Sequence, residues 1–182
     1  SSSFSLMACN MNPECFNKII IINPSDLATL NKTHNKRKNA LKFFIDTPML
    51  GTLIYNLIYT NRNINHTFYN RYYYKRHMVP TKLVHAYHEA AHICHSNGKY
   101  LLSSMKANYT NINIVHALKK INNSIYLIES KEKTNCKEII NSYLSYNSSI
   151  EASYINNSIY LPQLEVPEQL LDILNLYLDP IK

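Results

Sequence analysis

Two histidines and a glutamate within residues 81–99 have the types and the spacing of a catalytic zinc site. His88, Glu89 and His92 form the pattern HExxH. On a helix, residues four apart lie one turn above each other on the same face, so His88 and His92 can bind one zinc ion. Glu89 is placed to take a proton from a water on that metal, because zinc lowers the pKa of such a water towards about 7. The pattern predicts zinc-dependent hydrolysis of a peptide bond.

The residues around this pattern favour a capped and largely buried helix. Pro80 comes just before it, Thr81 can cap it, and Asn97-Gly98 tolerates a left-handed turn at its end. His85 and His95 point to the same side as the two predicted zinc ligands. His95 lies about 10.5 Å along the axis from His88 and cannot share its metal. We expect His85 and His95 to support the site or to fill the core.

A catalytic zinc needs a third protein ligand. Glu138 is the first choice, because it lies on a predicted helix over residues 134–146 that can hold it rigidly against the first helix. Glu151 and Glu129 are the alternatives, whereas Glu132 is expected to be a solvated charge. Tyr154 is a candidate for stabilising the oxyanion, although a tyrosine of the core or surface is the simpler interpretation.

Composition and charge limit the function classes. The chain has 182 residues, 46% of them hydrophobic, and a net charge of +7. It is long enough for one domain with a core of its own, and we expect that domain over residues 16–182, after a loosely ordered segment over residues 1–15. The positive charge allows an acidic partner. The sequence has no apolar run long enough to cross a membrane and no visible signal peptide.

Hydrophobic patterning predicts an alternation of helices and short strands. A buried strand is expected over Lys18–Ile22, and helices over residues 39–45, 49–59, 112–121, 134–146 and 168–178. Gly51 within the second of these helices indicates that another backbone packs close to it. Strands are expected over residues 64–74, 100–105, 122–127 and 156–161. The first of these would lie beside the zinc helix and pair with an extended substrate.

The motif and its surroundings resemble a known group of peptidases. HEAAH followed three residues later by His95 is similar to the glutamate-zincin peptidases of injected bacterial toxins and effectors, including clostridial neurotoxin light chains. Asp46-Thr47-Pro48 with Gly51 resembles a segment that precedes the motif in small type III effector peptidases. The metzincin extension is absent, because His95 and Gly98 stand where that pattern has glycine and histidine.

This resemblance implies a fold, a cofactor and a partner. The fold would be α+β, a single zincin-like metallopeptidase domain with its active-site helix packed on a small sheet. The cofactor would be Zn2+, and the protein would be a secreted effector in the host cytoplasm that cleaves a host protein. Size, composition and motif placement are similar to those of a Legionella effector protease that acts on host actin, so actin is the candidate substrate.

A second hypothesis is a basic, non-enzymatic domain that binds nucleic acid or an acidic protein. It predicts salt-sensitive binding without any dependence on metal. The peptidase hypothesis instead expects a protein substrate, no nucleic acid and no membrane. The sequence leaves the oligomeric state open.

Overall fold

The computed structural model describes residues 2–93 and 96–178, and the chain divides into two compact units. Unit 1 consists of residues 1–31 and 112–182, and unit 2 consists of residues 32–111. The second unit is inserted into the sequence of the first, and the single domain expected over residues 16–182 stays a prediction. Each unit is described by itself below.

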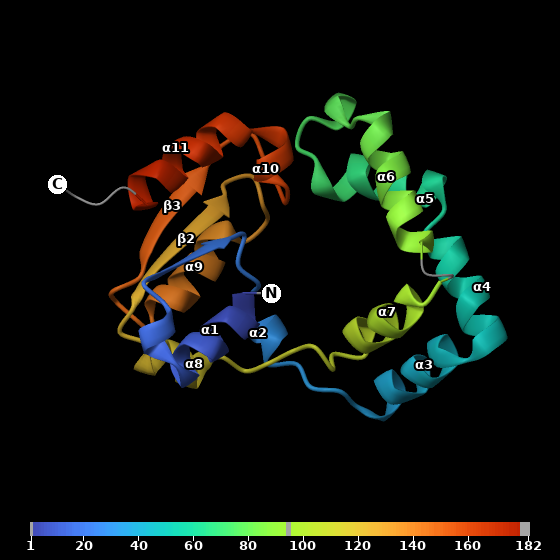
Figure 1. Ribbon diagram of the computed structural model, residues 1–182, viewed down its shortest axis with the longest axis horizontal. Coiled ribbons are helices and arrows are strands. Elements are labelled where there is room, and N and C mark those ends of the chain that lie inside the picture. The colour runs from blue at the N-terminus through green and yellow to red at the C-terminus, as the bar shows by residue number, and fades with distance from the viewer. Residues whose placement is uncertain (1, 94–95, 179–182) are drawn as a thin grey trace. The chain divides into compact units, whose positions relative to one another are not determined.

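Unit 1 is built on three parallel strands (Figure 1). Their order is β1 (Lys18–Ile22), β2 (Ser124–Ser130) and β3 (Glu151–Ile155), with both neighbouring pairs parallel. Parallel neighbours require crossover connections, which unit 2 and a following helix supply between β1 and β2. All three carboxyl ends consequently meet at one edge of the sheet.

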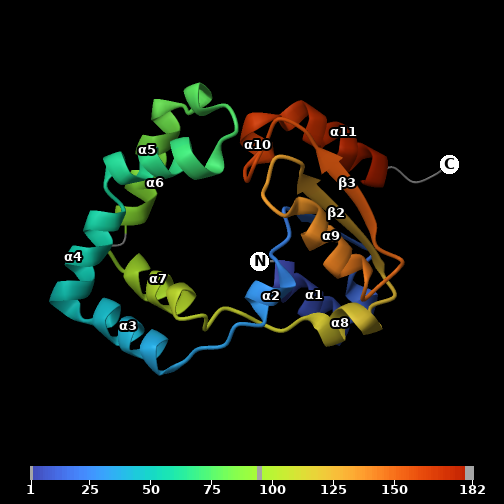
Figure 2. The ribbon, with the colours of Figure 1, turned by 180° about the vertical axis from the view of Figure 1, so that it is seen from behind.

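Helices cover both faces of this sheet (Figures 1 and 2). On β2, Ile125 and Leu127 face a core that helices before and after the strand complete, while Ile128 faces a second core around Leu170 and Tyr177. Burial on both faces explains the almost continuous apolar run in β2. The helices of unit 1 are α1 (Ser2–Met11), η1 (Pro13–Cys15), α2 (Leu27–Leu30), α8 (Val115–Lys120), α9 (Cys136–Leu144), α10 (Pro162–Glu165) and α11 (Pro167–Leu178).

The described residues of unit 2 form helices and turns only. The helices are α3 (Lys36–Asp46), α4 (Pro48–Ile58), α5 (Asn61–Thr67), η2 (Phe68–Tyr72, a π-helix), η3 (Arg76–Met78), α6 (Thr81–His92) and α7 (Gly98–Lys106).

Two polar contacts tie the helices of unit 2 together. The Tyr55 hydroxyl on α4 donates a hydrogen bond to the Ala91 carbonyl at 2.9 Å. The buried Lys99 donates to the Thr47 and Pro48 carbonyls, both at 3.3 Å, and so fixes α7 to the turn between α3 and α4. Both carbonyls also accept a hydrogen bond within α4, from the Gly51 nitrogen at 3.1 Å and from the Thr52 hydroxyl at 2.6 Å, so Lys99 adds a second donor to each.

Several local predictions are confirmed and several are wrong. The strand at Lys18–Ile22 and the helices corresponding to α3, α4, α6, α8, α9 and α11 are present. Residues 64–72 and 100–105, expected as strand, are helical, and residues 2–15 contain α1 and η1. Of the strands expected over residues 122–127 and 156–161, the first overlaps β2, while residues 156–161 form a loop after β3.

The α+β zincin-like fold is also wrong. The three strands are all parallel and have helices on both faces, which makes unit 1 an α/β unit. The helix that carries HExxH is α6, and its unit contributes no strand among the described residues. Among the described residues of its own unit it therefore has no sheet to pack on, and only Val84 of α6 is buried.

The close approach predicted at Gly51 is confirmed and gives a first testable result. A Cβ atom at Gly51 would lie 1.7 Å from the Ile45 carbonyl oxygen, which belongs to rigid main chain. We expect Gly51→Ala to displace α4 from α3 and to lower the free energy of unfolding of unit 2 by about 1–3 kcal/mol. Leu53→Ala, on the exposed side of the same helix, is the control. Equal urea midpoints for the two variants would contradict the close approach.

Candidate functional site

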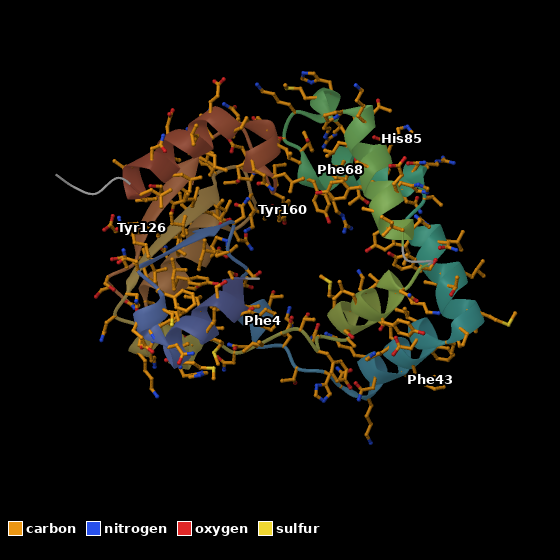
Figure 3. All side chains as sticks on the ribbon, in the orientation of Figure 1. Phe4, Phe43, Phe68, His85, Tyr126 and Tyr160 are labelled. Atoms are coloured by element: carbon orange, nitrogen blue, oxygen red, sulfur yellow. The ribbon has the colours of Figure 1, made fainter. Side chains whose placement is uncertain are left out.

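The predicted zinc residues lie on α6 in unit 2. His88 and His92 are half-buried with ring centroids 4.4 Å apart, so the prediction that they share a face is confirmed. The Nδ1 atom of His92 lies 2.8 Å from the His88 carbonyl oxygen. Because a carbonyl oxygen can only accept, Nδ1 is the donor of this hydrogen bond. Glu89 is exposed to solvent, and so is His85, labelled on α6 in Figure 3. His95 lies outside the described residues.

The proposed third ligands lie in the other unit. Glu138 is exposed on α9, Glu151 is exposed at the start of β3, and Glu129 is buried in β2. Within residues 2–93 and 96–178, no group of three or more His, Cys, Asp and Glu side chains is placed to hold a metal. Two imidazoles from one helix do not make a catalytic zinc site, so the residues present do not fit Zn2+.

The two remaining predicted residues also have different roles. Tyr154 is exposed on β3 in unit 1, whereas the HExxH pattern is in unit 2. Glu132, expected to be a solvated charge, accepts a hydrogen bond from the main-chain nitrogen of Asn157 at 3.0 Å. It joins the loop after β2 to the loop after β3.

A cavity of about 640 Å³ lies at the carboxyl ends of the strands of unit 1. Open sheets of parallel strands bind ligands at this edge, because the loops that follow the strands converge there. The volume is within the range of about 300–1,000 Å³ that is usual for small-molecule sites. Figure 3 labels Tyr160, from the loop after β3. The lining residues are Asn23, Pro24, Ser25, Asp26, Ala28, Thr29, Lys133, Thr134, Asn135, Glu138, Ile139 and Tyr160.

Asn23 fixes the loops around this cavity. Its φ of 50° is in the left-handed region, which asparagine tolerates better than most residues. Its Nδ2 donates to the Ile159 carbonyl at 3.3 Å and the Tyr160 carbonyl at 3.1 Å, and its Oδ1 accepts from the Ser130 nitrogen at 2.9 Å. One side chain directly after β1 thus joins the last residue of β2 to the loop that follows β3.

The loop after β3 has a second anchor. Glu165 on α10 accepts hydrogen bonds through Oε2 from the Ser158 hydroxyl at 2.9 Å and from the Ile159 nitrogen at 3.1 Å. Because Ser158 is fully buried, this part of the loop is held from both sides, by Glu165 and by Asn23. The position of Tyr160 at the cavity therefore depends on contacts from β1 and α10.

A buried ion pair joins Lys133 of the cavity lining to Glu129. Lys133 Nζ is 2.7 Å from Glu129 Oε1 and donates to the Pro24 carbonyl at 3.1 Å. Glu129 is 0% exposed, and its Oε2 has no hydrogen-bond partner among the described residues. Burial raises the pKa of the Glu129 carboxyl, and the neighbouring Lys133 opposes that shift. Lys133 Nζ also lies 5.7 Å from the ring centroid of Tyr160.

The remaining charges of the cavity are negative. Asp26 caps α2, accepting from the Ala28 nitrogen at 3.0 Å, while the Glu138 carboxylate is exposed. Since Glu129 compensates the charge of Lys133, the lining presents two carboxylates and no uncompensated cation. Such a lining favours ligands that donate hydrogen bonds or carry positive charge.

The fold of the chain is similar to that of α/β hydrolases. A serine hydrolase of carbazole degradation, CarC, matches with a TM-score of 0.70 and 9% identity over 97% of this chain and 59% of its own. The epoxide hydrolase CorEH matches with a TM-score of 0.69 and 14% identity over 100% of this chain and 65% of its own. A 2-hydroxy-6-oxo-6-phenylhexa-2,4-dienoate hydrolase from Rhodococcus sp. strain RHA1 matches with a TM-score of 0.65 and 12% identity over 97% of this chain and 60% of its own.

These matches concern the fold, since identities are low and the chain spans about three fifths of the matched proteins. No protein-family model matches the sequence, and a search of curated proteins gives no match. The matches overturn the resemblance to glutamate zincins and, with it, the zinc peptidase activity and the Zn2+ cofactor. The effector location and the actin substrate were implied by that resemblance alone. Every helix of the described residues is too short or too polar to cross a bilayer.

The chemistry of this fold sets clear requirements that the sequence meets only in part. α/β hydrolases place a serine in a G-x-S-x-G turn at the start of a helix, followed along the chain by an acid and then a histidine. The two glycines of this chain, Gly51 and Gly98, cannot form that motif. The last histidine is His116, exposed on α8 and outside the cavity lining, so the loops after β2 and β3 contain none.

The residues of the cavity gave a weak signal in the sequence. Asn23-Pro24 follows a buried strand directly, which is a common position for a loop at the carboxyl edge of a sheet. Lys133 and Tyr160 carry no local pattern that separates them from the other lysines and tyrosines. Glu138, selected as a zinc ligand, does line a candidate site, although for a different physical reason.

Proposed function

We propose that this chain binds a small molecule carrying amine or hydroxyl groups in the cavity at the carboxyl edge of unit 1, and that it does so without hydrolysing it. The observation that supports this proposal is the composition of that cavity, which has the volume of a small-molecule site and polar lining residues but no histidine. Asn23 and Glu165 hold its loops in place. Such fixed loops favour binding, because little conformational freedom is lost when the ligand enters.

The absence of a histidine among the cavity residues argues against a serine nucleophile there. A serine nucleophile needs a neighbouring group that accepts its proton. Lys133 is the residue of the lining whose side-chain nitrogen could act as a base, but this nitrogen contacts the Glu129 carboxylate and the Pro24 carbonyl. An ammonium group in those contacts has no lone pair to offer.

The two carboxylates of the lining determine the ligand class. Asp26 and Glu138 would attract an amine and accept hydrogen bonds from hydroxyl groups, whereas they would repel a phosphate or carboxylate. We expect glucosamine, spermidine or sorbitol to show saturation-transfer NMR signals with this protein, and gluconate and glucose 6-phosphate to show none. Preferential binding of the two anions would overturn the proposal.

A variant localises that binding. Glu138→Gln should weaken binding of the amines about two- to fivefold, as for the loss of one partly screened charge, and leave sorbitol binding almost unchanged. Glu168→Gln removes an exposed carboxylate from α11 that does not line the cavity, and it serves as the control. Equal losses in the two variants would place the ligand elsewhere.

Ester hydrolysis is the second candidate, and Ser3 is the observation that favours it. Ser3 is 4% exposed in the first turn of α1, and residues 1–5 read S-S-S-F-S where the hydrolase motif reads G-x-S-x-G. Its neighbours Ser2 and Ser5 line a smaller cavity together with Asn23 and Ser25 at the end of β1.

A covalent probe separates the two candidates. A fluorophosphonate reacts with activated serines, and mass spectrometry identifies the residue that carries it. Under the binding proposal no serine is labelled, and short-chain p-nitrophenyl esters are not hydrolysed faster than in buffer. Labelling at Ser3 that Ser3→Ala abolishes would replace the binding proposal by the hydrolase.

A further inference from the structure

The two units carry opposite net charges. Unit 2 holds 12 of the 19 lysines and arginines but only 2 of the 12 acidic residues, which gives it a net charge of +10. Unit 1 has a net charge of −3. A positive charge of this size within 80 residues produces a field that attracts polyanions and anionic surfaces.

Unit 2 also exposes a group of large apolar side chains where α3 meets α4. Phe43, marked on α3 in Figure 3, is 70% exposed, and Met49, in the first turn of α4, is 86% exposed. Soluble proteins seldom leave such groups uncovered. This group, here termed the apolar corner, comprises Phe43, Phe44, Met49, Leu50 and Leu53, all more than half exposed.

The apolar corner is rigidly supported from below. Gly51 lets α4 approach the main chain of α3, and Lys99 donates to the two carbonyls at the turn between these helices. Lys42 and Ser103 both contact the Asp46 carboxylate in the last turn of α3. The exposed side chains are therefore presented by a fixed scaffold and not by a loose loop.

Basic residues lie on the same helix as part of the apolar corner. Lys36, Arg37 and Lys38 form the first turn of α3, and the apolar residues Phe43 and Phe44 form its last turns. Cations beside aromatic and aliphatic side chains are typical of helices that lie in the interface of an anionic membrane. α4 has 11 residues and, at about 1.5 Å per residue, is too short to span a bilayer.

We propose that unit 2 docks on an anionic lipid surface through the apolar corner, with Lys36, Arg37 and Lys38 at the phosphate groups. The apolar side chains gain by leaving water, and the net charge of +10 is complementary to an anionic headgroup layer. The expectation that the protein has no membrane partner was based only on the lack of an apolar segment long enough to span a bilayer. This proposal is independent of the ligand cavity in unit 1.

Flotation of the full chain with vesicles tests the proposal. We expect binding to vesicles of equal parts phosphatidylcholine and phosphatidylserine, weakened by salt, and little binding to phosphatidylcholine alone. Exchange of Met49, Leu50 and Leu53 for serine should weaken binding on the order of a hundredfold. Exchange of Lys36, Arg37 and Lys38 for glutamine should weaken vesicle binding to a similar extent, because each lost charge weakens it about fivefold.

Matched variants in unit 1 control for general effects. Leu171→Ser with Leu176→Ser removes exposed apolar groups from α11, and Lys119→Gln with Lys120→Gln removes exposed charges from α8. Both should float like the unchanged protein. Circular dichroism melting curves must agree for all variants, since the altered side chains are exposed.

Three results would overturn the proposal. The first is no binding to either kind of vesicle, which is expected if the apolar corner is covered within the chain. The second is a dimer that the serine variant dissociates, which would assign the corner to a second copy. The third is binding that only the glutamine variant loses, since that behaviour indicates a purely electrostatic partner such as nucleic acid.

Discussion

Lys133→Met is expected to lower the free energy of unfolding by about 3–5 kcal/mol, because it leaves the Glu129 carboxylate buried without its cation. Methionine has a length similar to that of lysine and fills the space of its aliphatic chain. The loss of stability therefore measures the removal of the charge and not a change in side-chain volume. Urea unfolding followed by circular dichroism measures it. Lys137→Met, at an exposed position one turn further along the chain, should change the stability by less than about 0.5 kcal/mol.

The loss should depend on pH with a definite sign. Burial raises the pKa of the Glu129 carboxyl in the folded protein, and removal of Lys133 removes the cation that opposes this shift. The folded variant therefore binds a proton more readily than the unfolded chain does. Its stabilisation by protonation is complete below the unfolded pKa of about 4.3 and is lost as the pH rises through the folded pKa.

Comparison of the two lysine variants isolates this effect from general acid unfolding. The stability difference between Lys133→Met and Lys137→Met should shrink as the pH falls from about 8 to about 5. A double exchange of Lys133 and Glu129 for methionine should recover most of the lost stability at pH 8, because no buried charge remains. A difference that is constant with pH would show that Glu129 is not the cause.

Asn23→Ala is expected to cost about 2–4 kcal/mol and to loosen the rim of the cavity. The change removes three side-chain hydrogen bonds, one to the last residue of β2 and two to the loop after β3, each contributing about 0.5–1.5 kcal/mol. It also places alanine at a φ of 50°, which costs about 1 kcal/mol or more. Urea unfolding gives the total, and hydrogen exchange at the Ser130 amide reports the local loss.

Two further variants divide this cost between its causes. Asn23→Gly tolerates the positive φ and loses only the hydrogen bonds. Asn157→Ala changes an exposed asparagine at a φ of 59° for which no side-chain hydrogen bond is found within the described residues, so it measures the cost of the backbone conformation. If Asn157→Ala costs as much as Asn23→Ala, then Asn23 does not hold the loops together.

The same variant connects stability to the proposed function. Since Asn23 positions the Tyr160 main chain at the cavity, ligands of the cavity should bind Asn23→Ala more weakly than they bind Asn157→Ala. Vesicle binding should be unaffected in both, because the apolar corner belongs to unit 2.

The sequence by itself determined the elements whose signals are local. The strand at Lys18–Ile22, the helix over Thr81–His92 and the close approach at Gly51 depend on residues within a few positions of one another. The shared face of His88 and His92 followed from helical geometry alone. A correct local geometry was nevertheless not a site, because the third ligand had to come from elsewhere.

Short apolar runs could not be assigned from the sequence because two periods fit them. Ile64, Phe68 and Tyr72 are spaced by four, and the rings of Phe68 and Tyr72 are 5.5 Å apart in the helical arrangement. The same segment also alternates well enough for a strand, and only burial of Ile64 and Phe68 inside unit 2 decides between the two.

The tertiary structure alone decided which residues share a site. It assigned Glu138 and HExxH to different units, and it joined Asn23 to Tyr160 across 137 positions of the sequence. It also paired Glu129 with Lys133 of the cavity lining and left the apolar corner uncovered within unit 2. The physical reason is that parallel strands bring their carboxyl ends together through long crossovers, so that residues without any local relation meet at one edge.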